Sequence, residues 1–304
     1  MQNDSGKLTS IITADGYALA GTVFPASIRE PPYAVVINPG AGIPASYYAK
    51  FAEWLASLGV PVLTYDYRGV ARSRPRSLRG FRASVEDWGS KDCAAALQFM
   101  RVRYPGANIA IVGHSIGCFL TGFVNRPELI DTMVFIGAHT GYYKDYAPYR
   151  QLIMRMAWHV VMPKLTKLVG YFPGRALGLP ADLPRGVALE WAQRTQPDFW
   201  WNLRDERGRP DTSRMDRLRR GFASIACRGL MIQIADDDFA TADGIARVAS
   251  LFRGVDFERR MVRPFAASNQ SVEPIGHFGF FRSKYRESLW PHVSRWIVKS
   301  QQGG

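Results

Sequence analysis

The sequence predicts an α/β fold built on a mostly parallel sheet of about eight strands, with helices on both faces. Short β-rich runs alternate with amphipathic stretches along most of the chain, which is typical of strands joined by crossover helices. Tyr33–Asn38 (YAVVIN) is an uninterrupted apolar run, as expected of a strand covered on both faces. With 304 residues, 47% of them hydrophobic, the chain can form a large core without disulfide or metal support.

The first two strands are expected to form an antiparallel hairpin at one edge of the sheet, because the Asp15-Gly16 pair between them is a strong turn signal. The predicted strands are Lys7–Thr13, Ala18–Phe24, Tyr33–Asn38, Val60–Asp66, Asn108–Val112, Thr132–Gly137, Gly229–Ala235 and Asp256–Val262. Helices are predicted around Ser46–Leu58, Trp88–Arg103, the stretch after Ser115, Ala240–Phe252 and Lys284–Lys299.

Residues 141–224 interrupt the alternation. They contain no convincing strand and many aromatic residues, and structureless loops beyond ~15 residues are uncommon in compact domains. We therefore predict a helical cap (lid) insertion over 141–224, within a core formed by 1–140 and 225–304. The aromatic residues are Tyr142, Tyr143, Tyr146, Tyr149, Trp158, Tyr171, Phe172, Trp191, Phe199, Trp200 and Trp201.

Composition and charge exclude several classes of protein. Three scattered cysteines give neither a disulfide framework nor a zinc motif, so we expect no metal and a reducing location. The polar start and the lack of a long apolar run predict a cytoplasmic protein without a membrane span. The net charge of +13 is dispersed and comes with no nucleic-acid-binding motif, so no nucleic-acid partner is expected. The sequence gives no indication of the oligomeric state.

One glycine motif allows two interpretations. Gly40-Ala41-Gly42-Ile43-Pro44-Ala45 follows a strand and matches GxGxxA, with Asp66 at the end of the next strand, as in a dinucleotide site. Pro39 and Pro44 weaken that reading, and it leaves the second half of the chain unexplained. The alternative is a glycine loop whose backbone N–H groups approach a reacting carbonyl group.

The motif Gly113-His114-Ser115-Ile116-Gly117 favours the second interpretation. GxSxG places a serine on a sharp strand-to-helix turn, a nucleophile elbow, and here a buried strand precedes it and an apolar helix follows. A serine nucleophile needs a general base and a carboxylate that orients the base. His277 lies in a loop after the last strand, and Asp236, Asp237 and Asp238 end an earlier one, so the chain order suits a catalytic triad.

The oxyanion of such a reaction needs two N–H donors. The residue after the nucleophile, Ile116, is expected to supply one. The glycine loop is expected to supply the other, and we assign it to Ala41.

These motifs resemble those of the α/β-hydrolase superfamily, and the resemblance covers nearly the whole chain. The closest likeness is to a group of uncharacterised predicted α/β hydrolases near the serine aminopeptidase branch. The superfamily's usual spacing puts a small residue three positions before the acid, which here is Ala235, so the resemblance implies Asp238. The segments that carry the resemblance are NPGAG, the stretch Asp66–Ser73, GHSIG, ADDD, IGHFGFFR and the stretch Asp182–Trp191.

We therefore expect a serine hydrolase with the triad Ser115, Asp238 and His277, acting on a small acyl substrate without a cofactor. Aromatic residues in the predicted cap favour an apolar carboxylic ester or thioester. A peptidase or amidase of the serine aminopeptidase type, and a non-catalytic interaction protein of the same fold, are the alternatives.

Overall fold

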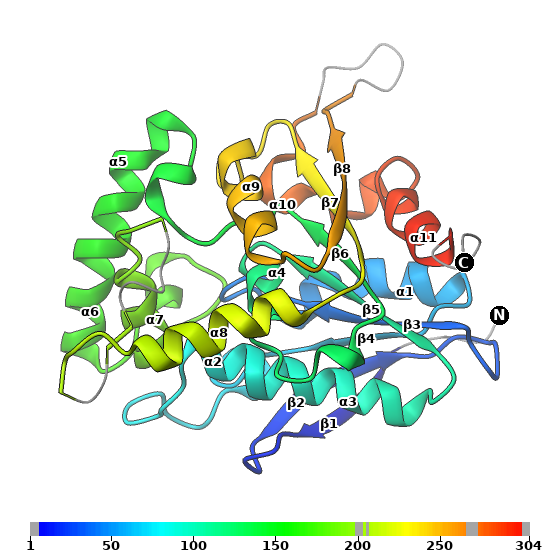
Figure 1. Ribbon diagram of the computed structural model, residues 1–304, viewed down its shortest axis with the longest axis horizontal. Helices are drawn as coiled ribbons and strands as arrows, with labels where there is room; N and C mark the ends of the chain where they lie inside the picture. The colour runs from blue at the N-terminus through cyan, green and yellow to red at the C-terminus, as the bar shows by residue number, and fades with distance from the viewer. Residues whose placement is uncertain (1–5, 198–202, 205–206, 266–272, 300–304) are drawn as a thin grey trace.

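The computed structural model describes residues 6–197, 203–204, 207–265 and 273–299, and it confirms the predicted α/β architecture (Figure 1). The eight strands lie in the order β1-β2-β4-β3-β5-β6-β7-β8. β1 and β2 form an antiparallel hairpin at the edge, β2 is antiparallel to β4, and the remaining neighbours are parallel. The strands are β1 (Lys7–Ile12), β2 (Ala18–Phe24), β3 (Tyr33–Asn38), β4 (Val62–Tyr65), β5 (Asn108–His114), β6 (Thr132–Ile136), β7 (Arg228–Ile234) and β8 (Asp256–Val262).

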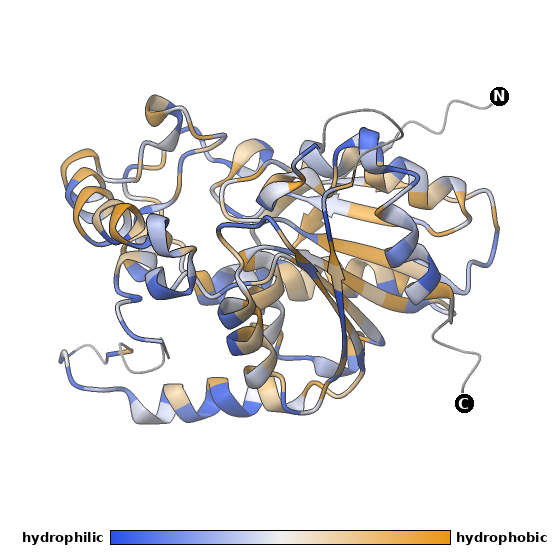
Figure 2. Cartoon of the chain, turned by 90° about the horizontal axis from the view of Figure 1, so that it is seen from above, coloured by the Kyte–Doolittle hydropathy of each residue, from blue (hydrophilic) through white to orange (hydrophobic). Residues whose placement is uncertain are grey.

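Alternate side chains of the central strands enter two separate cores, as the period of two in a strand requires. In β3, Ala34 and Val36 face one core, and Val35 and Ile37 face the other. Helices α1 (Ala49–Ser57) and α11 (Trp290–Lys299) pack on the second face, whereas α3 (Ala94–Arg103), α4 (Ile116–Leu120) and α9 (Ala242–Leu251) pack on the first. Figure 2 shows the apolar central strands between these layers.

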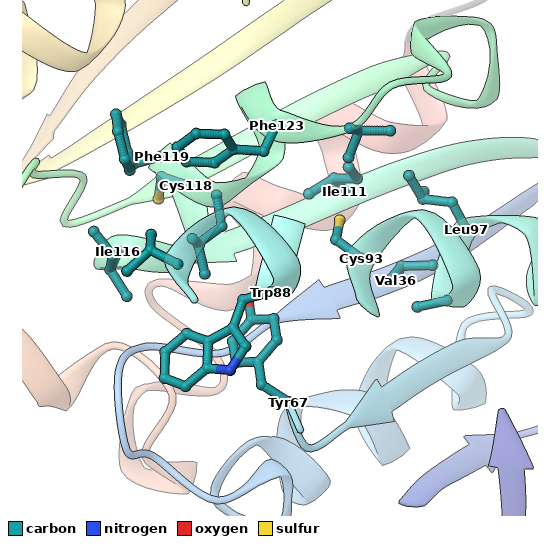
Figure 3. Packing of buried hydrophobic residues seen from close by; sticks show 14 of the residues in the cluster. Val36, Tyr67, Trp88, Cys93, Leu97, Ile111, Ile116, Cys118, Phe119 and Phe123 are labelled. Carbon is teal, nitrogen blue, oxygen red and sulfur yellow. The ribbon is translucent and has the colours of Figure 1, made fainter. Parts of the chain in front are cut away.

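The first core holds the helix that follows the predicted nucleophile (Figure 3). Cys118 and Phe119 of α4 are fully buried there. Below them Trp88 stacks on Tyr67, with ring centroids 4.9 Å apart, and its indole N–H donates to the Arg68 carbonyl at 3.1 Å. Cys118 therefore serves as a small buried apolar residue, and dense packing holds α4 in place.

Two helices differ from their predicted bounds. The closing helix begins at Trp290 and not at Lys284, because Pro291 is tolerated only in the first turn of a helix. Ser283–Tyr285 forms a separate 3₁₀ turn. The stretch Trp88–Cys93 is π-helical, between the short helix α2 (Val85–Asp87) and α3.

The described part of the segment between β6 and β7 contains four α-helices. Helices α5 (Pro148–Met156), α6 (Met162–Val169) and α7 (Arg185–Ala192) lie beside the sheet, at the left of Figure 1. Helix α8 (Thr212–Ser224) runs back to the core, where Leu218 and Phe222 are buried. The division into a core and a cap over 141–224 stays a prediction, and Phe199, Trp200 and Trp201 lie outside the described residues.

Among the described residues, none of the helices has the length and apolar character that a membrane crossing demands.

Candidate active site

Ser115 lies on a strained turn between β5 and α4, with φ 57° and ψ −126°. The two motif glycines make this turn possible. A Cβ atom on Gly113 would lie 2.8 Å from the Cα of Cys118, and one on Gly117 would lie 2.3 Å from the carbonyl oxygen of Asn38. Both distances are too short for any side chain, so the presence of glycine at these two positions has a direct steric cause.

The structure brings Ser115 and His277 together. The Oγ atom of Ser115 lies 2.9 Å from Nε2 of His277, a residue of the short helix α10 (Gly276–Gly279) that follows β8 in the chain. Nδ1 of the same ring lies 2.8 Å from Oδ2 of Asp237. All three side chains are buried. They follow three parallel strands, whose carboxyl ends meet at one edge of the sheet.

The prediction that Asp238 is the acid is wrong, because the carboxylate that contacts His277 belongs to Asp237. Strand β7 ends at Ile234, and the turn that follows directs Asp237 inward. Asp238 has a different partner, since its Oδ2 accepts a hydrogen bond from Nε of Arg150 at 3.0 Å. Asp236 accepts from the backbone N–H of Ile275. The family spacing therefore misplaces the acid by one residue.

Two backbone N–H groups, in addition to the imidazole, hold the carboxylate of Asp237 in place. Its Oδ1 accepts the backbone N–H groups of Phe239 at 2.8 Å and Ala240 at 2.9 Å. Burial alone would raise the pKa of Asp237, but His277 and the two N–H groups outweigh it and hold that pKa below its ordinary value. Gly137, with φ +58°, leaves room for the pair, since a Cβ there would lie 3.0 Å from Oδ2 of Asp237.

A second imidazole also contacts the serine. Nε2 of His139, just beyond β6, lies 2.9 Å from Oγ of Ser115, and its Nδ1 accepts the backbone N–H of Gly141 at 3.0 Å. Burial, followed by the nearby His277, holds the pKa of His139 well below its usual range. No motif in the sequence marks this histidine as a partner of the serine.

A buried hydrogen-bond chain links the glycine loop to the histidine loop. The Gly40 N–H donates to the Tyr48 hydroxyl at 3.0 Å, which lies 2.8 Å from Nδ1 of His114. Nε2 of His114 lies 3.0 Å from the carbonyl oxygen of His277. Because that carbonyl only accepts, Nε2 of His114 carries the proton, and the Tyr48 hydroxyl donates to Nδ1. Burial lowers the pKa of His114 to about 3, so the ring is neutral at working pH.

The glycine loop lies directly beside the serine. A Cβ atom on Gly40 would lie 3.3 Å from Cβ of Ser115, and Ala41 lines the same cavity as the serine. Ile116 is the first residue of α4, where the backbone N–H groups have no partner within the helix. Their predicted role as oxyanion donors is carried forward as a proposal.

The acidic residue that a dinucleotide site would need after this loop, Asp66, already has other partners. Asp66 is buried, and its two carboxylate oxygens accept the backbone N–H groups of Ala45 at 2.7 Å and Arg72 at 3.3 Å. A carboxylate already used in this way does not extend toward a ribose hydroxyl.

A cavity of about 290 Å³ opens above Ser115, His139 and His277. The rest of its described lining is almost entirely apolar and contains no Lys, Arg, Asp or Glu. Most of these residues come from the 141–224 segment. They are Ala41, Gly42, Ile43, Tyr146, Met154, Trp158, Met162, Phe172, Leu179, Pro180, Ala181, Leu183, Trp191, Phe239 and Phe278.

Within the described ranges, the His, Cys, Asp and Glu side chains form no group of three that could hold a metal ion.

Comparison with known proteins places this chain in a family. The family model described as serine aminopeptidase, S33, matches residues 29–197, which is more than half of the chain. The chain belongs to this family of α/β hydrolases. This hydrolase is also 28% identical over 113 residues to a monoglyceride lipase homolog of Monkeypox virus. That match covers 36% of this chain, and the chain spans only 39% of the length of the viral relative.

Solved structures support the fold of this hydrolase. An esterase from Pyrococcus furiosus superposes with a TM-score of 0.60 at 14% identity, covering 98% of this chain and 91% of the esterase. The α/β hydrolase GrgF from Penicillium sp. sh18 gives a TM-score of 0.61 at 16% identity, covering 97% of this chain and 98% of GrgF. At such low identities the likeness concerns the fold alone.

Proposed function

We propose that this protein is a serine hydrolase that cleaves a carboxylic ester or thioester through an acyl-enzyme. The single observation that carries the proposal is the buried chain of two hydrogen bonds, from Ser115 Oγ to His277 Nε2 at 2.9 Å and from His277 Nδ1 to Asp237 at 2.8 Å. Asp237 accepts only, so Nδ1 carries the proton and Nε2 is free to take one from the serine.

In the first half-reaction, Ser115 Oγ forms a bond to the acyl carbon while its proton moves to Nε2 of His277. The electron pair of the carbonyl bond moves to the oxygen, which we assign to the N–H groups of Ala41 and Ile116. Collapse of this intermediate breaks the bond to the leaving oxygen or sulfur, which receives the proton from His277. Asp237 stabilises the imidazolium that exists between the two transfers.

In the second half-reaction, water attacks the acyl carbon and gives a proton to His277. The bond to Ser115 Oγ then breaks, the proton returns to Oγ, and the carboxylic acid leaves. The two half-reactions consume one water molecule and need no redox partner.

The cavity supports an apolar acyl or alcohol group. Its described lining contributes aromatic and aliphatic side chains with no formal charge, so a charged substrate group would lose its hydration there without a partner. We propose that residues 141–224 act as a cap that covers this group. Two of the similar proteins described above, a monoglyceride lipase homolog and an esterase, are consistent with ester cleavage.

An aminopeptidase is the second candidate, since the matching family carries that description. Such an enzyme must bind the ammonium group of a peptide N-terminus, for which a carboxylate is the usual partner. The described lining of the cavity offers none. Ester or thioester cleavage is therefore the proposal we favour.

The test is a panel of p-nitrophenyl esters, acyl thioesters and aminoacyl anilides, combined with labelling by a fluorophosphonate. We expect turnover of esters or thioesters, and covalent labelling of Ser115. Ser115→Ala should remove the label and lower kcat by up to about a millionfold. Ser250→Ala, a change in an exposed serine of α9, is the matched control and should keep both. Esterase activity in folded Ser115→Ala protein would refute the proposal.

A further inference from the structure

The Ser115 hydroxyl lies between two imidazoles, and the structure assigns them different protonation patterns. His277 has a carboxylate on Nδ1, whereas His139 has a backbone N–H donor, that of Gly141, on Nδ1. A neutral imidazole carries one proton. His277 therefore has its proton on Nδ1 and accepts at Nε2, and His139 has its proton on Nε2 and donates there.

The hydroxyl group of Ser115 can form a hydrogen bond to each of the two rings at the same time. A hydroxyl has one proton and two lone pairs. The proton of Oγ points to His277 at 2.9 Å, and the N–H of His139 occupies one lone pair at 2.9 Å. One lone pair remains, on an atom that borders the cavity. His139 therefore selects which lone pair is available to attack a carbonyl carbon.

The backbone sets the tautomer of His139. Gly141 has φ +83°, a left-handed conformation that turns its N–H back onto Nδ1 two residues earlier. A Cβ atom at this position would lie 2.9 Å from the ring of Trp191, so the turn is specific to glycine. His139 cannot take the serine proton in this arrangement, which excludes it as a second general base.

We propose that His139 is a further catalytic residue, a neutral hydrogen-bond donor that contacts the nucleophilic oxygen through both half-reactions. The role rests on the proposed serine-hydrolase function. Oγ gains negative charge when its proton leaves for His277, and again when the bond from the acyl carbon to Oγ breaks. A fixed N–H donor stabilises that charge both times. The proton of His139 stays on Nε2 throughout, so all proton transfers of the reaction still pass through His277.

The test compares His139→Leu, which removes the donor, with His139→Gln, whose amide N–H can replace it. The readouts are the rate constant for fluorophosphonate labelling and the acylation burst with p-nitrophenyl acetate, a substrate too short to depend on the far end of the cavity. His139→Leu should lower both rates by on the order of 10- to 100-fold, the range expected for a lost hydrogen bond to a developing charge. His139→Gln should recover most of the loss.

His292→Leu is the matched control. This histidine lies in α11, which packs on the face of the sheet opposite α4, and it does not line the cavity. It should label at the normal rate. Equal losses in His139→Leu and His139→Gln would mean that the ring only fills space, and normal rates in both would refute the role.

A measurement on the unaltered protein covers the case in which His139→Leu does not fold. Nitrogen-15 NMR of the histidine rings should show His139 with an unprotonated Nδ1, a protonated Nε2 and no titration between pH 5 and pH 8. A proton on Nδ1 would overturn the inference. Because Ser115→Ala tests the hydrolase function separately, loss of labelling there with normal rates in both His139 variants would refute only the present inference.

Discussion

Replacing Asp237 by Asn changes the protonation of His277 while leaving the shape of the site intact. The Asn carbonyl oxygen can keep the two backbone N–H groups that Oδ1 now accepts, those of Phe239 and Ala240. The amide NH₂ then takes the place of Oδ2 and donates to Nδ1 of His277. The imidazole proton must move to Nε2, where it faces Ser115 Oγ and blocks proton acceptance.

The expected loss follows from that blocked step. A wrong tautomer in a Ser-His-Asp triad costs on the order of 10⁴-fold in kcat, which is roughly 5 kcal/mol of transition-state stabilisation. The fold should survive, since the two hydrogen bonds from backbone N–H groups persist and the one to His277 is kept with its direction reversed. We expect an unchanged circular dichroism spectrum and a small shift of Tm.

Asp238→Asn is the matched control, one residue away. Asp238 and Arg150 are each about one-third exposed in their side chains (33% and 33%), and an ion pair of that kind contributes less than about 1 kcal/mol. Its kcat should stay within about twofold of the unaltered protein. The assay is kcat/KM for a p-nitrophenyl ester, normalised to folded protein. A large loss of kcat/KM in Asp238→Asn, with a nearly normal value in Asp237→Asn, would refute the assignment of Asp237 as the partner of His277.

Three other predictions concern the buried histidines and the cavity. Tyr48→Phe removes the hydroxyl between Gly40 and His114 and leaves two buried polar groups unpaired, so urea unfolding should show a loss of roughly 2 kcal/mol; an unchanged midpoint would contradict the hydrogen-bond chain. His114 and His139 have pKa values below that of the unfolded chain, which therefore binds more protons below pH 6.5. Above pH 6.5 the free energy of unfolding should be insensitive to these two groups. Below pH 6.5 it should fall by up to about 1.4 kcal/mol per pH unit for each histidine, and the fall should end near pH 3 for His114. A slope unchanged by His139→Gln would contradict the assignment. Lengthening the acyl chain from acetyl to octanoyl should raise kcat/KM by a factor of several per methylene, because each buried CH₂ contributes ~0.8 kcal/mol; a flat series would show that the cavity does not hold the acyl group.

Local patterns in the sequence were sufficient for the sheet and for two residues of the site. Short β-rich runs that alternate with amphipathic stretches, together with turn signals, predict the eight strands, because strand and turn preferences depend on neighbouring residues. The GxSxG motif that marks the elbow around Ser115 is also local, and the steric need for Gly113 comes from Cys118 in the same turn. The steric need for Gly117 comes instead from the carbonyl oxygen of Asn38 at the end of β3, so it depends on the tertiary structure. His277 is predicted by its glycine-flanked position after the last strand. Its contact with the serine then follows from the fold, because the carboxyl ends of the parallel strands meet at one edge of the sheet.

The choice among Asp236, Asp237 and Asp238 was decided by the tertiary structure. Three identical side chains follow one strand, and a turn directs them to three different partners from distant parts of the chain: Ile275, His277 and Arg150. No local pattern distinguishes them.

The second imidazole and the buried hydrogen-bond chain were likewise decided by the tertiary structure. His139 meets Ser115, and Tyr48 meets His114, across separations of 24 and 66 residues. Local sequence specifies backbone turns and burial. The hydrogen-bond partner of a buried polar side chain is instead set by the groups that the folded chain brings next to it, because an unpaired buried polar group costs free energy.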